Sequence, residues 1–582
     1  MIPSLYVRSA SDRPSLSVGL LIDSEKLPRC FSEVVDHILQ SDFARLELLI
    51  INNEQGDSGA QPRRSMLRKA WNLIVSRQHR RLLLFALYQR WDRRHVDPAT
   101  DPEVLVDCTA RFAAVEAIRV LPIRNRFVHR FPDDVVRRIR EKRIDVLIRF
   151  GFNILRGDIL AAARCGVWSY HHGDGDFYRG GPSHLWEIVE QNPLSGVMLQ
   201  VLTEELDAGK VLCKGWFATQ AGISLARNRV QPYWGASTFV IQKLRELHMF
   251  GCEKLLNDAE VGKPFRGRKP IYKAPTNAEM LRWLAPAVAR KLYRKLTRRP
   301  KIAHWRLAIR CGGPLIAESA GSPDLSGFRW IDSPPGRFYA DPFLIEEGGR
   351  RWCFFEDFDY ATNKGSISCA EIGDDGAFDA VPVLERPYHL SYPCIFRVAN
   401  DLYMIPESIA AGAVELYRCD RFPGRWTLVR KLLELPAVDT TMWFDADRFW
   451  LFVTLQEPRG FAVQLLLFSA GALTGPWIPH PANPLSTDIR TSRGAGRIFR
   501  HHGKILRPSQ DCSEFYGRRF TLNEIVALDG DRYEERRGVT VDPGWAPRLI
   551  GTHTYSQLGQ IEVIDGCATL SPAQVFGRGR RV

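Results

Sequence analysis

Short polar phrases recur at regular intervals in the second half of the chain, and this repeat constrains the fold more than any other feature of the sequence. After Phe338 the phrases lie about 50 to 60 residues apart, and several precede an aromatic-rich run of strand length. They begin at Tyr339, Ser391, Asp439, Ser492 and Thr552. Several short strands per repeat at this period indicate an all-β five-bladed propeller. A β-sandwich is the alternative.

The first part of the chain, up to about residue 215, has a different texture. Apolar runs of strand length at residues 18–22, 46–51, 82–87 and 146–150 alternate with helical patterns, of which 30–40 and 132–142 are the clearest. This alternation is typical of a doubly wound α/β domain built on a parallel sheet. We therefore expect a Rossmann-like α/β domain at residues 1–257 and a propeller at residues 314–582.

The segment between them, residues 258–313, reads as a basic linker. Residues 263–310 hold 15 Lys and Arg against one acid, Glu279, and residues 63–94 hold ten basic residues against Asp92, although the whole chain carries only +14. Such local blocks indicate contact with phosphates, anionic lipid or an acidic partner, and no specific nucleic acid; solvated helix faces are the alternative. Within the linker, apolar residues three or four apart predict an amphipathic helix, kinked or restarted at Pro286. This helix can lie on an anionic membrane surface or dock on the preceding domain.

Targeting and redox features are sparse. The sequence has no uninterrupted apolar run of membrane-spanning length and no apolar centre near residues 1–15, so we expect a cytoplasmic protein, peripheral at the inner membrane face if the linker binds lipid. The 12 cysteines form no CxxC pair, which disfavours a zinc ribbon and a disulfide framework. No metal site is expected.

A chain of preserved spacings marks the first domain. From His171 the intervals to Arg179, Trp186, Gly196 and Asp207 match in register those of a known family, and the strand and loop at 145–155 precede them. On these residues the sequence resembles the formyltransferases that use 10-formyltetrahydrofolate, which act on methionyl-tRNA, glycinamide ribonucleotide or sugar amines. The resemblance implies that 10-formyltetrahydrofolate is the formyl donor and that the backbone of the loop holds the pterin, at Phe150, Gly151, Phe152, Asn153 and Leu155. It also places Arg179, Gly180 and Trp186 beside the substrate.

The chemistry explains why these residue types would converge. An amine attacks the formyl carbon, negative charge builds on the formyl oxygen, and the amine sheds a proton. His171 could stabilise that charge or relay the proton, and Asp207 could orient the imidazole. The family has Asn where this chain has Ser169, whose hydroxyl is a shorter donor and the third catalytic candidate. Loss of one oxyanion donor costs about 10² to 10³ in kcat in other enzymes, so efficient catalysis requires that Ser169, Asn153 or a backbone amide takes this role. His172 lacks the spacing to Arg179 and Asp207, and a degenerate domain that keeps His171 for packing is the alternative.

The second half carries a resemblance of its own. Phrases such as Tyr339-Ala340-Asp341-Pro342 resemble five-bladed glycosidases of the arabinanase and invertase kind, and a longer set resembles the propeller domain of plant glucosamine inositolphosphorylceramide transferases. Because the inner strand of each blade faces a central channel, we expect polar groups to converge there, namely Asp341, Glu407, Asp439, Arg493, Asp511 and His553. Binding of a glycan or glycolipid is the first interpretation. Hydrolysis with Asp341 as base and Glu407 as acid, and a purely scaffolding role, are the alternatives.

Together these features predict an enzyme that transfers a formyl group from 10-formyltetrahydrofolate to an amine, in the first instance an amino sugar in glycan or sugar-nucleotide biosynthesis. The alternative is a glycan-binding or glycoside-hydrolase-like protein whose formyltransferase domain is degenerate. Formylation of transfer RNA is a third hypothesis, which the lack of the usual small C-terminal RNA-binding barrel disfavours.

Overall fold

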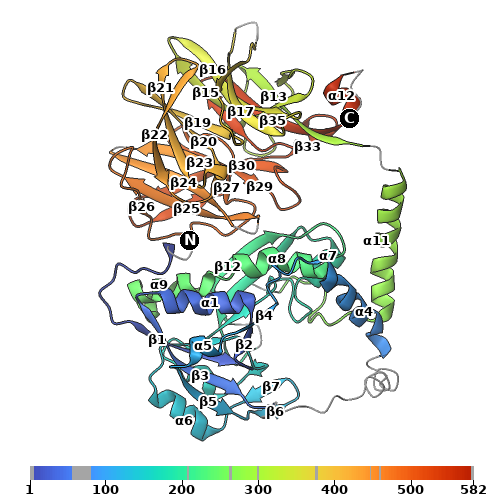
Figure 1. The fold of residues 1–582 in the computed structure, drawn as a ribbon, viewed down its shortest axis with the longest axis vertical. Coiled ribbons are helices and arrows are strands. Elements are labelled where there is room, and N and C mark those ends of the chain that lie inside the picture. The colour runs from blue at the N-terminus through green and yellow to red at the C-terminus, as the bar shows by residue number, and fades with distance from the viewer. Residues whose placement is uncertain are drawn as a thin grey trace. The chain divides into compact units, whose positions relative to one another are not determined.

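The protein was analysed as a computed structural model that describes residues 5–54, 80–205, 209–260, 265–297, 300–373, 378–445, 447–457 and 460–577. The chain divides into two compact units, Met1–Leu296 and Thr297–Val582, which are described separately (Figure 1). This division falls inside the segment expected to be a linker. Residues 63–79 of the basic block at residues 63–94 lie outside the described residues.

The N-terminal unit is built on a mixed sheet with the strand order β12-β11-β10-β8-β1-β3-β5 among the described residues. The five strands from β10 to β5 run parallel, and β11 and β12 add an antiparallel edge. Their bounds are β1 Leu16–Ile22, β3 Ala44–Asn52, β5 Glu116–Val120, β8 Val146–Arg149, β10 Val167–His171, β11 Leu194–Val201 and β12 Lys210–Ala218. A parallel α/β sheet, as expected from the alternating pattern, is therefore present.

Helices cover this sheet through apolar faces. α6 (Asp133–Glu141) places Val136 and Ile139 in a core with Leu48 of β3 and Leu147 of β8. α1 (Arg29–Gln40) contacts both β3 and α9 (Phe239–Phe250), and α9 also contacts β12 (Figure 1). The packing leaves the carboxyl ends of β8 and β10 next to each other, since these strands are parallel neighbours.

Residues 82–87 were expected to form a strand, and this prediction is wrong: α4 is a helix at Leu83–Asp92. Its residues Phe85 and Tyr88, three positions apart, both enter an apolar cluster with Trp186 and Tyr272. A short apolar run is compatible with a buried strand and with a helix. Here Phe85 and Tyr88, three residues apart, lie on one face of a helix and both reach the core.

The amphipathic helix of the basic segment is present as α11 (Asn277–Thr297), which continues through Pro286 as one helix. Its first turns dock on the N-terminal unit, where Met280 is buried and Trp283 and Leu284 pack against the same cluster. Its last turns leave an apolar stripe exposed, because Val288, Leu292 and Leu296 have exposed fractions of 50%, 57% and 77%. Among the described residues, no helix is both long and apolar enough to cross a bilayer.

The described strands of the C-terminal unit form five antiparallel sheets. The first three sheets are β15 Arg337–Glu347, β16 Arg350–Asp359, β17 Lys364–Glu371 and β18 Val381–Leu384; β19 Ser391–Val398, β20 Asp401–Glu407, β21 Val414–Arg421 and β22 Arg425–Leu433; and β23 Ala437–Asp445, β24 Arg448–Gln456, β25 Ala462–Ala470 and β26 Ile478–Pro479. The fourth comprises β27 Arg493–Gly494, β28 Phe499–His501, β29 Lys504–Asp511, β30 Arg519–Leu528, β31 Tyr533–Arg536 and β32 Thr540–Val541. The fifth comprises β13 Ile302–Cys311, β14 Arg329–Trp330, β33 Leu549–Gly551, β34 Tyr555–Leu558 and β35 Ile561–Leu570.

These sheets form a propeller-like ring and not two stacked layers. The inner strand β15 contacts β19, β19 contacts β23, β23 contacts β27, and β34 contacts β15; the bridge from Gly496 to Tyr555 joins the fourth and fifth sheets. The fifth sheet takes strands from both ends of the unit, because β13 pairs along its whole length with β35. Residues 302–311, expected in the linker, therefore close the ring, since an unpaired β35 would present an open sheet edge.

The recurring polar phrases mark the same bend in successive blades. Asp341, Tyr392 and Asp439 have φ of 54°, 45° and 48°, and each lies where its inner strand bulges against the next strand. Non-glycine residues persist in this left-handed region only where the surrounding structure holds them. The repeat in the sequence thus records a repeated bulge that turns side chains toward the centre of the ring.

Candidate functional site

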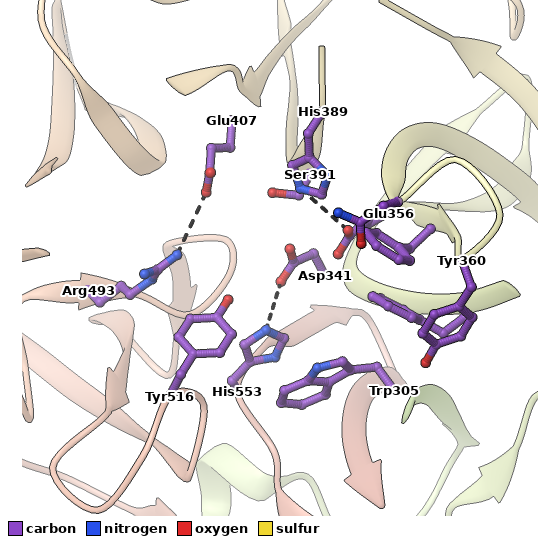
Figure 2. Close-up of a pocket in the computed structure, with 13 residues that line it drawn as sticks. Trp305, Asp341, Glu356, Tyr360, His389, Ser391, Glu407, Arg493, Tyr516 and His553 are labelled. Carbon is purple, nitrogen blue, oxygen red and sulfur yellow. Dashed lines mark ion pairs between the residues drawn. The ribbon is translucent and has the colours of Figure 1, made fainter. Parts of the chain in front are cut away.

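A cavity of about 320 Å³ opens at the centre of the ring, and we call it the central pocket. Figure 2 shows carboxylate, imidazole and guanidinium groups converging on it from different blades, with the rings of Trp305 and Tyr360 on one side and that of Tyr516 beside Arg493. The pocket is lined by Trp305, Phe338, Asp341, Glu356, Phe358, Tyr360, Asn363, His389, Ser391, Glu407, Arg493, Tyr516 and His553.

Two register positions supply the pocket carboxylates. The bulge residue of an inner strand provides Asp341, and the residue of the second strand that pairs just before the bulge provides Glu356 in the first blade and Glu407 in the second. The third blade has Thr454 at the latter position. Glu356 follows Asp341 at the same interval by which Glu407 follows Tyr392, so this spacing in the sequence could have identified Glu356.

Asp341 is almost fully buried and held by several donors. Its carboxylate accepts hydrogen bonds from Thr554 Oγ1 at 2.7 Å and from the Tyr392 backbone N–H at 3.2 Å. Its Oδ1 lies 3.6 Å from His553 Nε2, and on the other side of that ring Nδ1 lies 2.5 Å from Asp565 Oδ2. Burial raises the pKa of Asp341 to about 6, although the neighbouring His553 works against the rise. Burial opposes the charge on His553, but Asp565 and Asp341 outweigh it and raise the pKa of this imidazole.

A second charged group lies across the pocket. Arg493 contacts Asp439 through Nε, lies 3.7 Å from Glu407 Oε2, and stacks over the Tyr516 ring at 4.6 Å. Gln510 Nε2 donates to the same Asp439 carboxylate at 3.1 Å. Burial, with the charge of Asp439 second, raises the pKa of Glu407 well above its usual range, and Arg493 only partly offsets this.

The remaining wall combines Glu356 with aromatic rings. Glu356 Oε1 lies 3.5 Å from His389 Nε2, and burial together with the charge of Asp341 raises the pKa of Glu356 well above its usual range. Phe338 and Phe358 stack at 4.6 Å, and Trp305 stacks on His553 at 3.9 Å. The pocket therefore offers several acceptors and a few donors against apolar faces.

Most of the expected channel residues meet here. Asp341, Glu407, Arg493 and His553 line the pocket, and Asp439 lies behind Arg493. Asp511 does not line it, since its carboxylate accepts from Ser513 and lies 3.2 Å from Arg519. The sequence interpretation missed Glu356, Asp565 and Trp305; the last two come from the closing strands β35 and β13, which carry none of the recurring phrases.

Two groups of side chains in the described residues have donor atoms close enough together to share a metal ion, Asp341 with His553 and Asp565, and Glu318 with His501 and His502. In the first group the imidazole already bonds Asp565 at 2.5 Å, so the group forms a closed internal network. The second group lies outside the central pocket.

In the N-terminal unit, Ser169 and His171 lie on one face of β10, two positions apart. The His171 Nε2 contacts the Tyr178 carbonyl oxygen at 2.9 Å, which assigns the proton to Nε2 in the neutral ring and leaves Nδ1 as its basic nitrogen. Ser169 is buried, and its hydroxyl accepts from Arg149 Nη1 at 2.8 Å. A guanidinium, which the sequence interpretation missed, thus lies beside the serine that replaces the family's asparagine. Asp207 lies outside the described residues.

The loop expected to hold a pterin makes its backbone contacts within the protein. The N–H groups of Phe150 and Gly151 donate to Leu21 O, that of Phe152 donates to Asp23 Oδ1 at 2.8 Å, and that of Asn153 donates to His129 Nδ1 at 3.3 Å. Leu155 is buried in the core of the unit. The side chain of Asn153 is exposed, so its amide can reach a ligand although the backbone N–H groups of this loop cannot.

Three residues expected beside the substrate contact the start of the basic segment. Arg179 stacks over Phe265 at 4.8 Å, and Gly180 lies so close to Tyr272 that a Cβ there would be 2.3 Å from its carbonyl oxygen. Trp186 is buried in the cluster with Tyr272 and donates through Nε1 to Lys273 O at 3.2 Å. In this structure Trp186 is a core residue.

Comparison with known proteins places a match on the C-terminal unit. Residues 330–544 match the family model described as "Glucosamine inositolphosphorylceramide transferase 1, N-terminal". The proteins of that name from Oryza sativa subsp. japonica and Arabidopsis thaliana are each 34% identical, over 40% and 34% of this chain and 33% and 27% of their own lengths. The chain thus spans about a third or less of the curated relatives it matches.

Solved structures show weaker likenesses. A family 117 glycoside hydrolase from Zobellia galactanivorans has a TM-score of 0.30 and 14% identity over 48% of this chain and 96% of its own. A glycinamide ribonucleotide transformylase from Symbiobacterium toebii has a TM-score of 0.27 and 13% identity over 40% of this chain and 88% of its own. These scores carry no argument about the site. The C-terminal unit is therefore similar in sequence, over residues 330–544, to the N-terminal part of glucosamine inositolphosphorylceramide transferases.

Proposed function

We propose that the chain is a carbohydrate-directed transferase whose central pocket binds an amino sugar. The observation that carries this proposal is the composition of the pocket, in which carboxylates outnumber cations against aromatic walls. A volume of about 320 Å³ lies at the small end of ligand pockets and suits a single sugar unit.

The charge balance favours a cationic sugar. Asp341, Glu356, Glu407 and Asp439 are opposed by Arg493 and His553, and burial raises the pKa of the first three. Such carboxylates gain from a ligand ammonium, because an opposite charge offsets the cost of desolvating the ionised form. The rings of Trp305, Phe338 and Phe358 would cover the apolar face of a sugar while its hydroxyls donate to the acids. The names of the relatives, which refer to glucosamine and to a transferase, support the same class.

The experiment compares three methyl glycosides that differ only at one position: methyl glucosaminide, its N-acetyl form and methyl glucoside, titrated into the full chain by calorimetry. We expect the free amine to bind most tightly. Glu407→Gln should weaken binding of the amine about 10-fold or more, since it removes a buried partner of the ammonium. Equal affinity for all three glycosides, or no binding, would contradict the proposal.

The matched control is Glu371→Gln in β17, outside the pocket, which should bind like the wild type. Adding an oligosaccharide of glucosamine tests the alternative of hydrolysis by Asp341 and Glu407. Cleavage that is lost in Glu407→Gln would make the pocket a hydrolase site instead.

We propose further that the N-terminal unit transfers a formyl group from 10-formyltetrahydrofolate to an amine, again of an amino sugar. The preserved spacings from His171 support this, together with its place at the carboxyl end of β10 beside Ser169 and Arg149. His171 would accept the amine proton at Nδ1, and the Arg149 guanidinium would stabilise negative charge in place of the missing asparagine amide. The bonded N–H groups of residues 150–153 do not offer a pterin the backbone donors expected there, so no step is derived from that loop.

Incubation of the full chain with 10-formyltetrahydrofolate and methyl glucosaminide, followed by mass spectrometry of the sugar, tests this activity. We expect formylated product with wild type and almost none with His171→Ala. His95→Ala, which changes an exposed histidine of the same unit, is the control. Full turnover by His171→Ala would remove the assignment of that histidine, and no turnover by wild type would remove formyl transfer while leaving sugar binding untouched.

A further inference from the structure

Away from the central pocket, two consecutive histidines and a glutamate gather on the wall of a separate cavity of about 970 Å³. Glu318 ends the short helix η4 (Ile316–Glu318), His501 ends β28, and His502 follows it in the turn to β29. Their donor atoms all lie within 4.8 Å of one another. His501 Nε2 is 3.9 Å and His502 Nε2 is 3.7 Å from the same oxygen, Glu318 Oε1.

The hairpin explains how neighbouring histidines reach one oxygen. Successive residues of a strand point to opposite faces, but His502 has φ of 44° and Gly503 has φ of 79°, which makes a two-residue turn between His501 and Lys504. The two imidazole rings are therefore close, with centroids 4.2 Å apart at 66°. The backbone places both rings on the side of η4.

A hydrogen bond to its second carboxylate oxygen orients Glu318. Its second oxygen, Oε2, accepts the Leu315 backbone N–H at 3.2 Å, so that Oε1 is the oxygen facing the histidines. An anchored ligand of this kind is typical of metal centres, where outer hydrogen bonds fix the coordinating atom.

One imidazole of this group has a ring nitrogen that the protein leaves unsatisfied. His501 Nε2 is a buried polar atom without a hydrogen-bond partner. A buried imidazole nitrogen without a partner is costly unless something satisfies it.

We propose that Glu318, His501 and His502 form a zinc site. Two imidazole nitrogens and one carboxylate oxygen are a donor set that zinc prefers, and bonds of about 2.0 Å place tetrahedral ligand atoms roughly 3.3 Å apart. The separations of 3.7 and 3.9 Å between Glu318 Oε1 and the two histidine nitrogens exceed this value by about half an ångström, and all three ligand atoms lie within 4.8 Å of one another. Three protein ligands would leave a fourth position for water or a substrate, and the cavity lined by these three residues is also lined by Lys504 and Arg536.

The test is a zinc titration of the untagged full chain, freed of metal by a chelator, against a chromophoric competitor. We expect one zinc per chain, and an affinity lowered by about 100-fold or more in Glu318→Gln, His501→Ala and His502→Ala, because loss of even an outer hydrogen bond costs about 10- to 100-fold. Zinc should also raise the melting temperature of wild type, since a ligand that binds only the folded state stabilises it. The three variants should lose this rise.

His95→Ala, an exposed histidine of the other unit, is the control for adventitious histidine binding, and it should bind zinc like the wild type. Asp565→Asn tests the other group of donors, Asp341, His553 and Asp565. Zinc binding that is unchanged in the three site variants, or that disappears in Asp565→Asn instead, would overturn the assignment, as would no binding to wild type. Melting curves in chelator show whether each variant is folded, so that a misfolded variant is replaced by His502→Gln, which alters only an exposed turn residue.

Discussion

Asp341 brings together backbone geometry and charge at one residue. Its left-handed φ turns the side chain inward, and Thr554, Tyr392 and His553 surround the carboxylate. Because burial raises the pKa of Asp341 to about 6, the group changes charge within the range in which most proteins are folded. Its ionisation should therefore be visible in ligand binding.

We predict that the affinity for methyl glucosaminide rises about tenfold between pH 5 and pH 7. Below pH 6 Asp341 is mostly protonated and cannot pair with an ammonium, whereas above pH 6 it is ionised, and a pKa of about 6 gives roughly a tenfold change in ionised fraction over this interval. Glu356 and Glu407, raised well above their usual range, extend the rise in the same direction. Calorimetry at several pH values measures it. Asp341→Asn should flatten the rise near pH 6, and an affinity that falls from pH 5 to pH 7 would contradict the prediction.

Arg149 is the residue on which efficient formyl transfer should depend. Its guanidinium donates to Ser169 Oγ at 2.8 Å and to the carbonyl oxygen of Gly151 at 3.2 Å. If it replaces the asparagine amide, Arg149→Met should lower kcat about 10² to 10³-fold, as loss of an oxyanion donor does elsewhere. Arg149→Lys, which keeps the charge, should retain more activity. Arg156→Met is the control, since Arg156 pairs with Glu204 and not with Ser169; equal losses in both methionine variants would assign a structural role to Arg149.

Among single residues, the sequence predicted site residues where they belong to a repeat or to a set of preserved spacings. Asp341, Arg493 and His553 belong to recurring phrases and meet in the central pocket with Glu407, which was expected there from the resemblance. Asp565 and Arg149 could not be predicted in this way, because each acts through a neighbour brought by pairing of distant strands: β35 with β13 and β34, and β8 with β10. Asp511 shows the reverse, since it was expected in the channel but pairs in the sheet with Arg519, to which its carboxylate lies close.

Among the elements, α11 combines a docked half with an exposed half. Val288, Leu292 and Leu296 stand exposed, and Arg290, Lys291, Arg294 and Lys295 flank them. We predict that the full chain sediments with vesicles containing phosphatidylserine and that the triple variant Val288→Ser, Leu292→Ser, Leu296→Ser does not. Apolar burial in the interface and attraction of about 1 kcal/mol per basic residue support binding. Leu39→Ser on α1, an exposed helix leucine, should leave sedimentation unchanged. Equal sedimentation of the triple variant would show that the stripe does not bind lipid.

The helices and strands also show where the sequence pattern does not predict secondary structure. The alternation of strands and helices correctly indicated β1, β3, β8, α1 and α6. Residues 82–87 were expected to be a strand but lie in a helix, whose geometry places Phe85 and Tyr88 on one face against Trp186 and Tyr272. Both of these partners are distant in sequence. Tertiary contacts of this kind decide between helix and strand where a short apolar run permits both.

For the whole molecule, the decisive contact joins the two ends of the C-terminal unit. β13 pairs with β35 over ten residue pairs from Ile302 with Leu570 to Cys311 with Ile561. Arg310 on β13 also forms a buried ion pair with Glu562, which is fully buried and accepts from the Ile316 N–H at 2.8 Å. The ring is thus closed by a strand that precedes every recurring phrase, and the boundary inferred from the phrases alone, residue 314, omits it.

This closure predicts different fates for two truncations. A fragment of residues 297–582 should fold, with a cooperative melting transition, because it keeps both β13 and β35. A fragment of residues 314–582 should aggregate or melt without cooperativity, since it exposes the edge of β35 and leaves Glu562 buried without Arg310, a loss of about 3 to 5 kcal/mol for a broken buried pair. Circular dichroism melts of both fragments measure this. Arg310→Met in the longer fragment separates the two causes, because it removes the ion pair while keeping the strand; a stable, cooperative 314–582 fragment would show that the ring does not need β13.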